Sequence, residues 1–141
     1  MTATMTGTAL DNFPVPPCAR MLGYRFQSVD SEAKTMRVRF EATPEMLNPA
    51  GTVQGGFLVA MLDDVMGSMI VVLTEGEKIP ASVDLHTQFL RPAKPGAFVG
   101  EARLIHMTNS TAFTEATLYD EAGEAAATAR QTQRLFPARG A

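Results

Sequence analysis

The sequence has few of the residues that mark several protein classes. It contains one cysteine, Cys18, so no disulfide can form within the chain, and an oxidising compartment is not indicated. Its net charge of −3 excludes a general nucleic-acid-binding protein, which needs a basic surface. Charged residues make up only 19% of the chain, below the roughly 25% that is usual for a globular domain. This leaves surface for a partner, for example a second copy of the chain.

Common catalytic and cofactor motifs are also missing. The sequence has no G-x-S-x-G element, no phosphate-binding loop and no dinucleotide fingerprint. The two histidines, His86 and His106, do not stand at zinc-ligand spacing from another ligand, so we expect no metal and no cofactor. No leader-like start is present, and acidic residues interrupt the longest apolar run, so we expect neither a signal peptide nor a membrane span. These absences predict a cytoplasmic protein.

The length of 141 residues predicts one domain, which we place at residues 14–136 after a flexible Thr-rich tail at residues 1–13. An apolar run at residues 57–73 predicts a buried helix of about 18 residues. Period-two alternation and turn residues predict strands around it. The expected strands cover residues 24–29, 35–40, 82–90, 98–107, 111–119 and 124–136. The fold class is therefore α+β, with a long central helix and an antiparallel sheet of about five to six strands.

Two features of the central helix indicate chemistry. Asp63 and Asp64 lie within the apolar run, where an ionised carboxylate is costly unless it has partners. Gly55 and Gly56 stand at the start of the helix, where free N–H groups can stabilise a developing oxyanion. The plain alternatives are one solvent-facing aspartate and a simple glycine cap. Asp63 and Gly55 are ~12 Å apart along one helix, so they can act on one carbonyl only if a second subunit brings its own helix alongside.

The segment 48–56 (NPAGTVQGG), followed by Asp63, resembles the hotdog-fold acyl-CoA thioesterases of the phenylacetate-degradation type, which are similar to 4-hydroxybenzoyl-CoA thioesterase. The order of strands and helix over about residues 20–136 resembles the same family. The resemblance implies hydrolysis of an acyl-CoA thioester to free acid and CoA. In it, the Asp63 carboxylate activates water and the Gly55 N–H polarises the carbonyl.

The resemblance also implies further contacts and an assembly. It gives Asn48 and Gln54 supporting catalytic roles. It implies substrate contacts at Gly56, Ser82, Asp84, Arg91, Lys94, Asn109 and Ser110. The family forms dimers whose sheets join edge to edge, commonly paired into tetramers, so the expected partners are acyl-CoA and copies of the chain, with no nucleic acid and no membrane. CoA is then part of the substrate and not a cofactor.

Two positions depart from the family pattern. Gln54 stands where the family usually has histidine, and an amide cannot transfer a proton in acid–base catalysis. Gly67 stands one turn beyond Asp63, where relatives often carry a hydroxyl. Three alternatives therefore stay open: a non-catalytic acyl-CoA-binding hotdog protein, a hotdog hydratase or dehydratase, and an oligomeric domain without a ligand.

Overall fold

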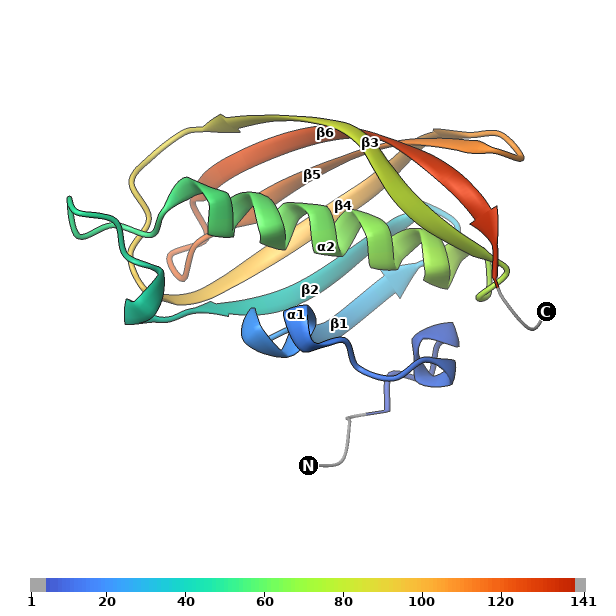
Figure 1. Ribbon diagram of the computed structural model, residues 1–141, viewed down its shortest axis with the longest axis horizontal. Coiled ribbons are helices and arrows are strands. Elements are labelled where there is room, and N and C mark those ends of the chain that lie inside the picture. Colours follow the sequence, from blue (N-terminus) through green and yellow to red (C-terminus); the bar gives the residue numbers. More distant parts are fainter. Residues whose placement is uncertain (1–4, 139–141) are drawn as a thin grey trace.

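The computed structural model describes residues 5–138, in which an antiparallel sheet wraps around one long helix, α2 (Gly55–Leu73) (Figure 1). The sheet has six strands in the order β1-β2-β4-β5-β6-β3. The strands are β1 (Arg25–Asp30), β2 (Thr35–Ala42), β3 (Lys78–Phe89), β4 (Gly96–Met107), β5 (Thr111–Tyr119) and β6 (Ala125–Pro137). This arrangement confirms the predicted hotdog fold, and it leaves β1 and β3 as the two edges of the sheet.

The described residues also include three short helical segments. The segments η1 (Ala9–Asn12) and α1 (Pro17–Met21) precede β1, and η2 (Pro44–Met46) lies between β2 and α2. The η1 turn lies within the segment expected to be a flexible tail. There the Asp11 carboxylate accepts the Thr6 and Gly7 backbone N–H groups, each at 2.8 Å. Within the expected tail, Ala9–Asn12 thus form a hydrogen-bonded turn, and residues 1–4 lie outside the described residues.

The core lies between α2 and the concave face of the sheet. Leu58, Met61, Leu62, Val65, Met66, Met69 and Ile70 are the buried residues of the helix. Gly100 of β4 lets the helix come close to the sheet, because a Cβ there would lie 3.1 Å from the Val65 side chain. By length and mean hydropathy (1.9) α2 is long and apolar enough to cross a membrane. Half of that hydrophobic window is buried, as in the core helix of a globular fold.

Strand β3 differs from the sequence prediction in two ways. It begins at Lys78, before the expected start at residue 82, because residues 78–81 pair with the end of β6. Its pairing register also shifts between Ser82 and Asp84, which makes Val83 the extra residue of a β-bulge. An uninterrupted period of two from residue 82 would place Val83 on the same face as Leu85, but Val83 is 65% exposed. The bulge interrupts the period of two on which that expectation rested.

Candidate functional site

Asp63 lies on α2 opposite the edge strand β3, where it forms a closed triangle of hydrogen bonds. The Ser82 hydroxyl donates to Asp63 Oδ1 at 2.7 Å. Gln131 of β6 donates from Nε2 to the same Asp63 oxygen and, at 2.8 Å, to Ser82 Oγ. One carboxylate oxygen thus receives two donors. The other oxygen has no hydrogen-bond partner among residues 5–138.

The triangle of Asp63, Ser82 and Gln131 is buried on the side of Gln131 and exposed to solvent on the side of Ser82. Asp63 is half-buried and Ser82 is exposed, since β3 has no further strand beyond it. Gln131 is buried between α2 and the sheet, with 3% of its surface exposed. A carboxylate that is fixed at one oxygen and accessible at the other can accept a proton from a bound water.

Sequence reasoning missed Gln131, although the pattern of β6 contains a signal for it. Ala127, Ala129 and Leu135 alternate along the strand and are buried on its inner face. Gln131 and Gln133 occupy the same period-two positions and are buried with them. A polar side chain on an apolar face needs a hydrogen-bond partner, and Asp63 is that partner for Gln131.

The start of α2 presents the second candidate group. Gln54 is the N-cap residue, and its side-chain oxygen accepts the Gly56 N–H at 2.7 Å. Among the described residues, no hydrogen bond uses the Gly55 N–H, which leaves it available to an incoming carbonyl. The Phe89 ring packs against Gly55, where a Cβ would lie 2.9 Å from the ring. Gln54 and Gly56 thus bind each other, and Gly55 is the candidate oxyanion donor.

Asn48 lies in the loop before α2 and binds that loop. Its carboxamide oxygen accepts the Ala50 and Thr52 N–H groups at 3.0 and 3.1 Å, and its nitrogen donates to the Thr52 hydroxyl at 3.0 Å. The side chain is therefore occupied in shaping the turn that leads to the Gly55 N–H. Within one protomer its role is to position the loop.

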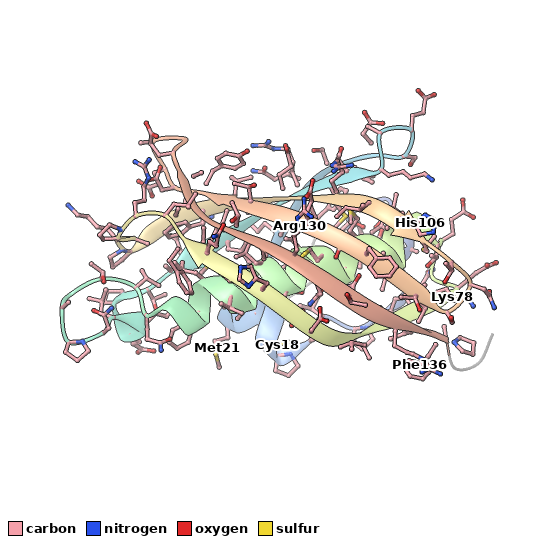
Figure 2. All side chains as sticks on the ribbon, turned by 90° about the horizontal axis from the view of Figure 1, so that it is seen from above. Cys18, Met21, Lys78, His106, Arg130 and Phe136 are labelled. Atoms are coloured by element: carbon pink, nitrogen blue, oxygen red, sulfur yellow. The ribbon has the colours of Figure 1, made fainter. Side chains whose placement is uncertain are left out.

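The residues expected to bind CoA fall into two groups at opposite ends of the sheet. Arg91 follows β3 and contacts the β5–β6 turn, donating to the Ala125 carbonyl at 3.0 Å. Lys94 is exposed in the same β3–β4 connection. Asn109 lies in the β4–β5 turn, where it accepts a hydrogen bond from Lys78 at 3.2 Å. Figure 2 shows Lys78 and His106 toward the same end of the sheet.

Ser110 accompanies Asn109 in the β4–β5 turn, where its carbonyl accepts the Leu135 N–H at 2.8 Å. Asp84 lies elsewhere, on the face of the sheet turned away from α2, because it pairs with Thr132, an outward-facing residue of β6. Its carboxylate accepts the Thr132 N–H at 3.3 Å. Within one protomer the structure therefore does not bring Asp84 to the Asp63 triangle.

The second aspartate of the pair is in a different environment. Burial, with a smaller contribution from the neighbouring charge of Asp63, raises the pKa of Asp64 to about 6. One oxygen of Asp64 is buried without a partner among the described residues. On the same side of α2, the Tyr24 hydroxyl donates to Ser68 at 2.8 Å. Within residues 5–138 no cluster of His, Cys, Asp and Glu has the geometry of a metal site.

Comparisons with known proteins show the family to which this chain belongs. The sequence model of the thioesterase superfamily matches residues 50–127. A phenylacetic acid degradation-related protein from Ralstonia eutropha JMP134 is 36% identical, with a TM-score of 0.83 over 89% of this chain and 95% of that one. Two more distant structures share the fold.

The first is the Escherichia coli PaaI protein of the phenylacetic acid degradation operon, which is 20% identical with a TM-score of 0.80 over 92% of this chain and 91% of that one. The second is a Haemophilus influenzae thioesterase, which is 17% identical with a TM-score of 0.76 over 84% and 82%. The match to residues 50–127 includes the start of α2, Asp63 and Ser82. The chain therefore belongs to the thioesterase superfamily, and thioester hydrolysis is the activity that this membership supports.

Proposed function

We propose that this protein hydrolyses an acyl-CoA thioester to the free acid and CoA. The observation that carries the proposal is the Asp63 carboxylate, which is fixed at Oδ1 by Ser82 and Gln131 and open to solvent near the β3 edge. Water is a weak nucleophile until a base takes its proton, and a half-buried carboxylate in a fixed orientation suits that role.

The reaction then follows from the groups present. Asp63 accepts one proton from water while the resulting hydroxide bonds to the thioester carbonyl carbon. The carbonyl oxygen becomes an oxyanion and accepts the Gly55 N–H at the positive end of α2. When the oxyanion re-forms the carbonyl, the C–S bond breaks. The CoA thiolate then leaves and takes the proton that Asp63 received.

The two groups come from different protomers in this proposal. Eight residues of helix separate Gly55 from Asp63, a rise of ~12 Å that no single thioester carbonyl spans. A second copy that pairs along β3 would bring its own Gly55 to Asp63. The edge position of β3 and its exposed apolar residues Val83 and Phe89 support such a dimer. We further propose that the dimers pair into a cytoplasmic homotetramer.

An antiparallel dimer would also join the two groups of CoA contacts. Arg91 and Lys94 lie at one end of the sheet, and Asn109 and Ser110 lie at the other end. A two-fold axis across β3 would bring the first end of one protomer near the second end of its partner. The cations would then bind the CoA phosphates, and the polar turn would contact the rest of the nucleotide. CoA enters as substrate, and the proposal requires no cofactor and no metal.

Substituting Asp63 tests this proposal most directly. Asp63→Asn keeps the shape of the side chain and removes the base, so we expect kcat to fall by at least about a hundredfold with little change in thermal stability. The assay measures free thiol released from a panel of aromatic, short-chain and medium-chain acyl-CoAs. Glu45→Gln, which removes an exposed carboxylate, is the control. Parental turnover in purified Asp63→Asn would show that Asp63 is not the base.

One observation favours a second candidate function, acyl-CoA binding without hydrolysis. Gln54 caps Gly56 with its amide, and an amide cannot donate a proton to a leaving thiolate. Binding of acyl-CoA to the parental protein without thiol release from any member of the panel would support this second function. Thiol release would support hydrolysis.

A further inference from the structure

We propose that Gln131 is a positioning residue for the hydrolysis, holding Asp63 and Ser82 in the orientation that leaves one Asp63 oxygen free for water. The inference rests on the proposed function, in which Asp63 is the base. It concerns a side chain on β6, about 70 residues after Asp63 in the chain.

The Gln131 amide nitrogen donates to both polar side chains of the site. Nε2 donates to Asp63 Oδ1 and, at 2.8 Å, to Ser82 Oγ. Because Ser82 Oγ accepts from Gln131, its own proton turns to Asp63 Oδ1, which it reaches at 2.7 Å. The opposite orientation of the amide would place its oxygen against the carboxylate, so the hydrogen-bond pattern selects a single arrangement.

The acceptor end of Gln131 has no such partner. Its Oε1 atom is buried and makes no hydrogen bond to any residue from 5 to 138. An unpaired buried acceptor destabilises the folded state. The side-chain hydrogen bonds that Gln131 makes within residues 5–138 are both directed at the site, to Asp63 and to Ser82.

The strand that carries Gln131 is well placed to fix the site. β6 lies between β5 and β3, and Gln131 pairs with Thr114 on one side and Leu85 on the other. Ser82, in contrast, is on the edge strand beside the β-bulge. Gln131 thus connects α2 and the edge strand to the interior of the sheet, and it limits the rotation of both polar side chains.

Gln133 provides a matched control. It lies two residues further along β6 on the same inner face, and it is 1% exposed. It also has one unpaired end, Nε2. Its oxygen accepts from Thr114 at 3.4 Å, and none of its hydrogen bonds in the described chain reaches Asp63 or Ser82. The two glutamines therefore differ mainly in their contact with the site.

The experiment compares Gln131→Met with Gln133→Met, since methionine matches glutamine in length and lacks the amide. We expect kcat of Gln131→Met to fall at least about tenfold with KM changed by less than about twofold, because the base is no longer held in place. Both constants of Gln133→Met stay within about twofold of the parental values. Each variant loses an unpaired buried group and also a hydrogen bond, so we expect the thermal unfolding temperatures of the two variants to change to a similar extent.

A second measurement does not depend on turnover. A ¹³C NMR titration follows the Asp63 carboxyl carbon in the parental protein and in both variants. Removal of the Gln131 donor favours the protonated carboxyl, so the midpoint moves to higher pH in Gln131→Met and stays in place in Gln133→Met. Asp64 is the titratable neighbour of Asp63 on α2 and is the same in all three proteins. Ser82 and Gln131, which face Asp63 from β3 and β6, carry no charge.

A double variant adds the last constraint. If Gln131 acts through Asp63, then Gln131→Met in the Asp63→Asn background lowers kcat no further. An unchanged kcat and an unchanged midpoint in Gln131→Met would overturn the inference, as would an equal loss in Gln133→Met. If the midpoint shifts in Gln131→Met but the parental protein hydrolyses no acyl-CoA, the contact between Gln131 and Asp63 is confirmed and the proposed function is rejected.

Discussion

Two adjacent carboxylates on α2 have different surroundings because neighbouring helix positions point about 100° apart. Asp63 faces Ser82 and Gln131, which donate hydrogen bonds to its charged form. Asp64 faces the side of Tyr24 and Ser68, and the Ser68 hydroxyl donates to the Asp64 backbone carbonyl at 2.8 Å and not to its carboxylate. Two donors therefore hold the Asp63 carboxylate in one orientation, whereas ionisation of Asp64 opposes folding.

This contrast predicts a stabilising substitution. Burial raises the pKa of Asp64 from 3.8 to about 6, so the folded protein binds the proton more tightly than the unfolded chain does. Stability therefore falls as pH rises from about 4 to 6 and stays lower above that range, by roughly 3 kcal/mol at most. Asp64→Asn removes this ionisation, so we expect it to raise the unfolding free energy at pH 7 and to flatten the dependence between pH 4 and 6.

Urea unfolding at a series of pH values measures this effect. Glu45→Gln serves as the control because Glu45 is exposed, and its curve should follow the parental one. A lower stability of Asp64→Asn than of the parental protein at pH 7 would mean that the ionised carboxylate has a stabilising partner. Such a result would contradict the account of Asp64 given above.

At the scale of elements, the start of α2 and the end of β3 depend on each other. The Phe89 ring rests where a side chain at position 55 would begin, 2.9 Å from an added Cβ. Alanine is otherwise favourable in a helix compared with glycine, so the sequence of the helix alone gives no reason for Gly55. The reason is the contact with β3, which holds the first turn of the helix and its free N–H in place.

A double-mutant cycle tests this coupling. Gly55→Ala should lower stability by about 1 kcal/mol, because the added methyl group displaces the ring. Phe89→Leu removes the ring, and in that background Gly55→Ala should be neutral or stabilising. Thermal unfolding of the four proteins gives the interaction energy. Additive effects would mean that Phe89 does not restrict position 55.

The sequence alone was sufficient to predict the helix and strands whose hydrophobic patterns are local. The apolar run of residues 57–73 predicted α2, and the alternation of residues 111–119 predicted β5 with the same bounds. The bulge at Val83 was not predictable, because the register of β3 depends on its pairing with β6. The same dependence on pairing explains why Asp84, predicted to contact substrate, lies on the outer face within one protomer.

The site was predicted only in part, for a related reason. Asp63 and Gly55 stand out within the helix itself, one as a charge among apolar residues and the other as a glycine at its start. Gln131 stands out only when the inner face of β6 is known, since its strand begins with alanines that favour a helix. The separation of Arg91 from Asn109 likewise follows from strand order and not from spacing in the sequence.

At the scale of the whole molecule, one protomer carries an incomplete site on an unpaired edge. Asp63 and Gly55 are two turns apart on one helix, and the residues predicted to bind CoA are split between the two ends of the sheet. The edge between them, β3, has free backbone groups along its length and exposed apolar side chains. These features are all accounted for if a second copy pairs with β3 across a two-fold axis.

Substitution of Val83 tests this arrangement. Val83 is 65% exposed in the single chain, so a lysine there should leave the fold of the protomer intact. Two lysines that face each other across a β3–β3 contact would repel and resist burial, so Val83→Lys should shift the particle to the 15.2 kDa monomer and abolish turnover. Met21→Lys is the matched control, because Met21 is 67% exposed and lies on α1, toward the opposite edge of the sheet (Figure 1).

Light scattering coupled to size exclusion measures the mass, and thiol release measures the activity. Met21→Lys should keep the parental mass and rate. If Val83→Lys also keeps them, the edge of β3 is not the interface and Gly55 of a second copy cannot reach Asp63 by this route. A monomer that retains full turnover would be more informative, because the oxyanion would then have a donor within one chain. The Gly55 N–H lies too far from Asp63 along α2 to be that donor.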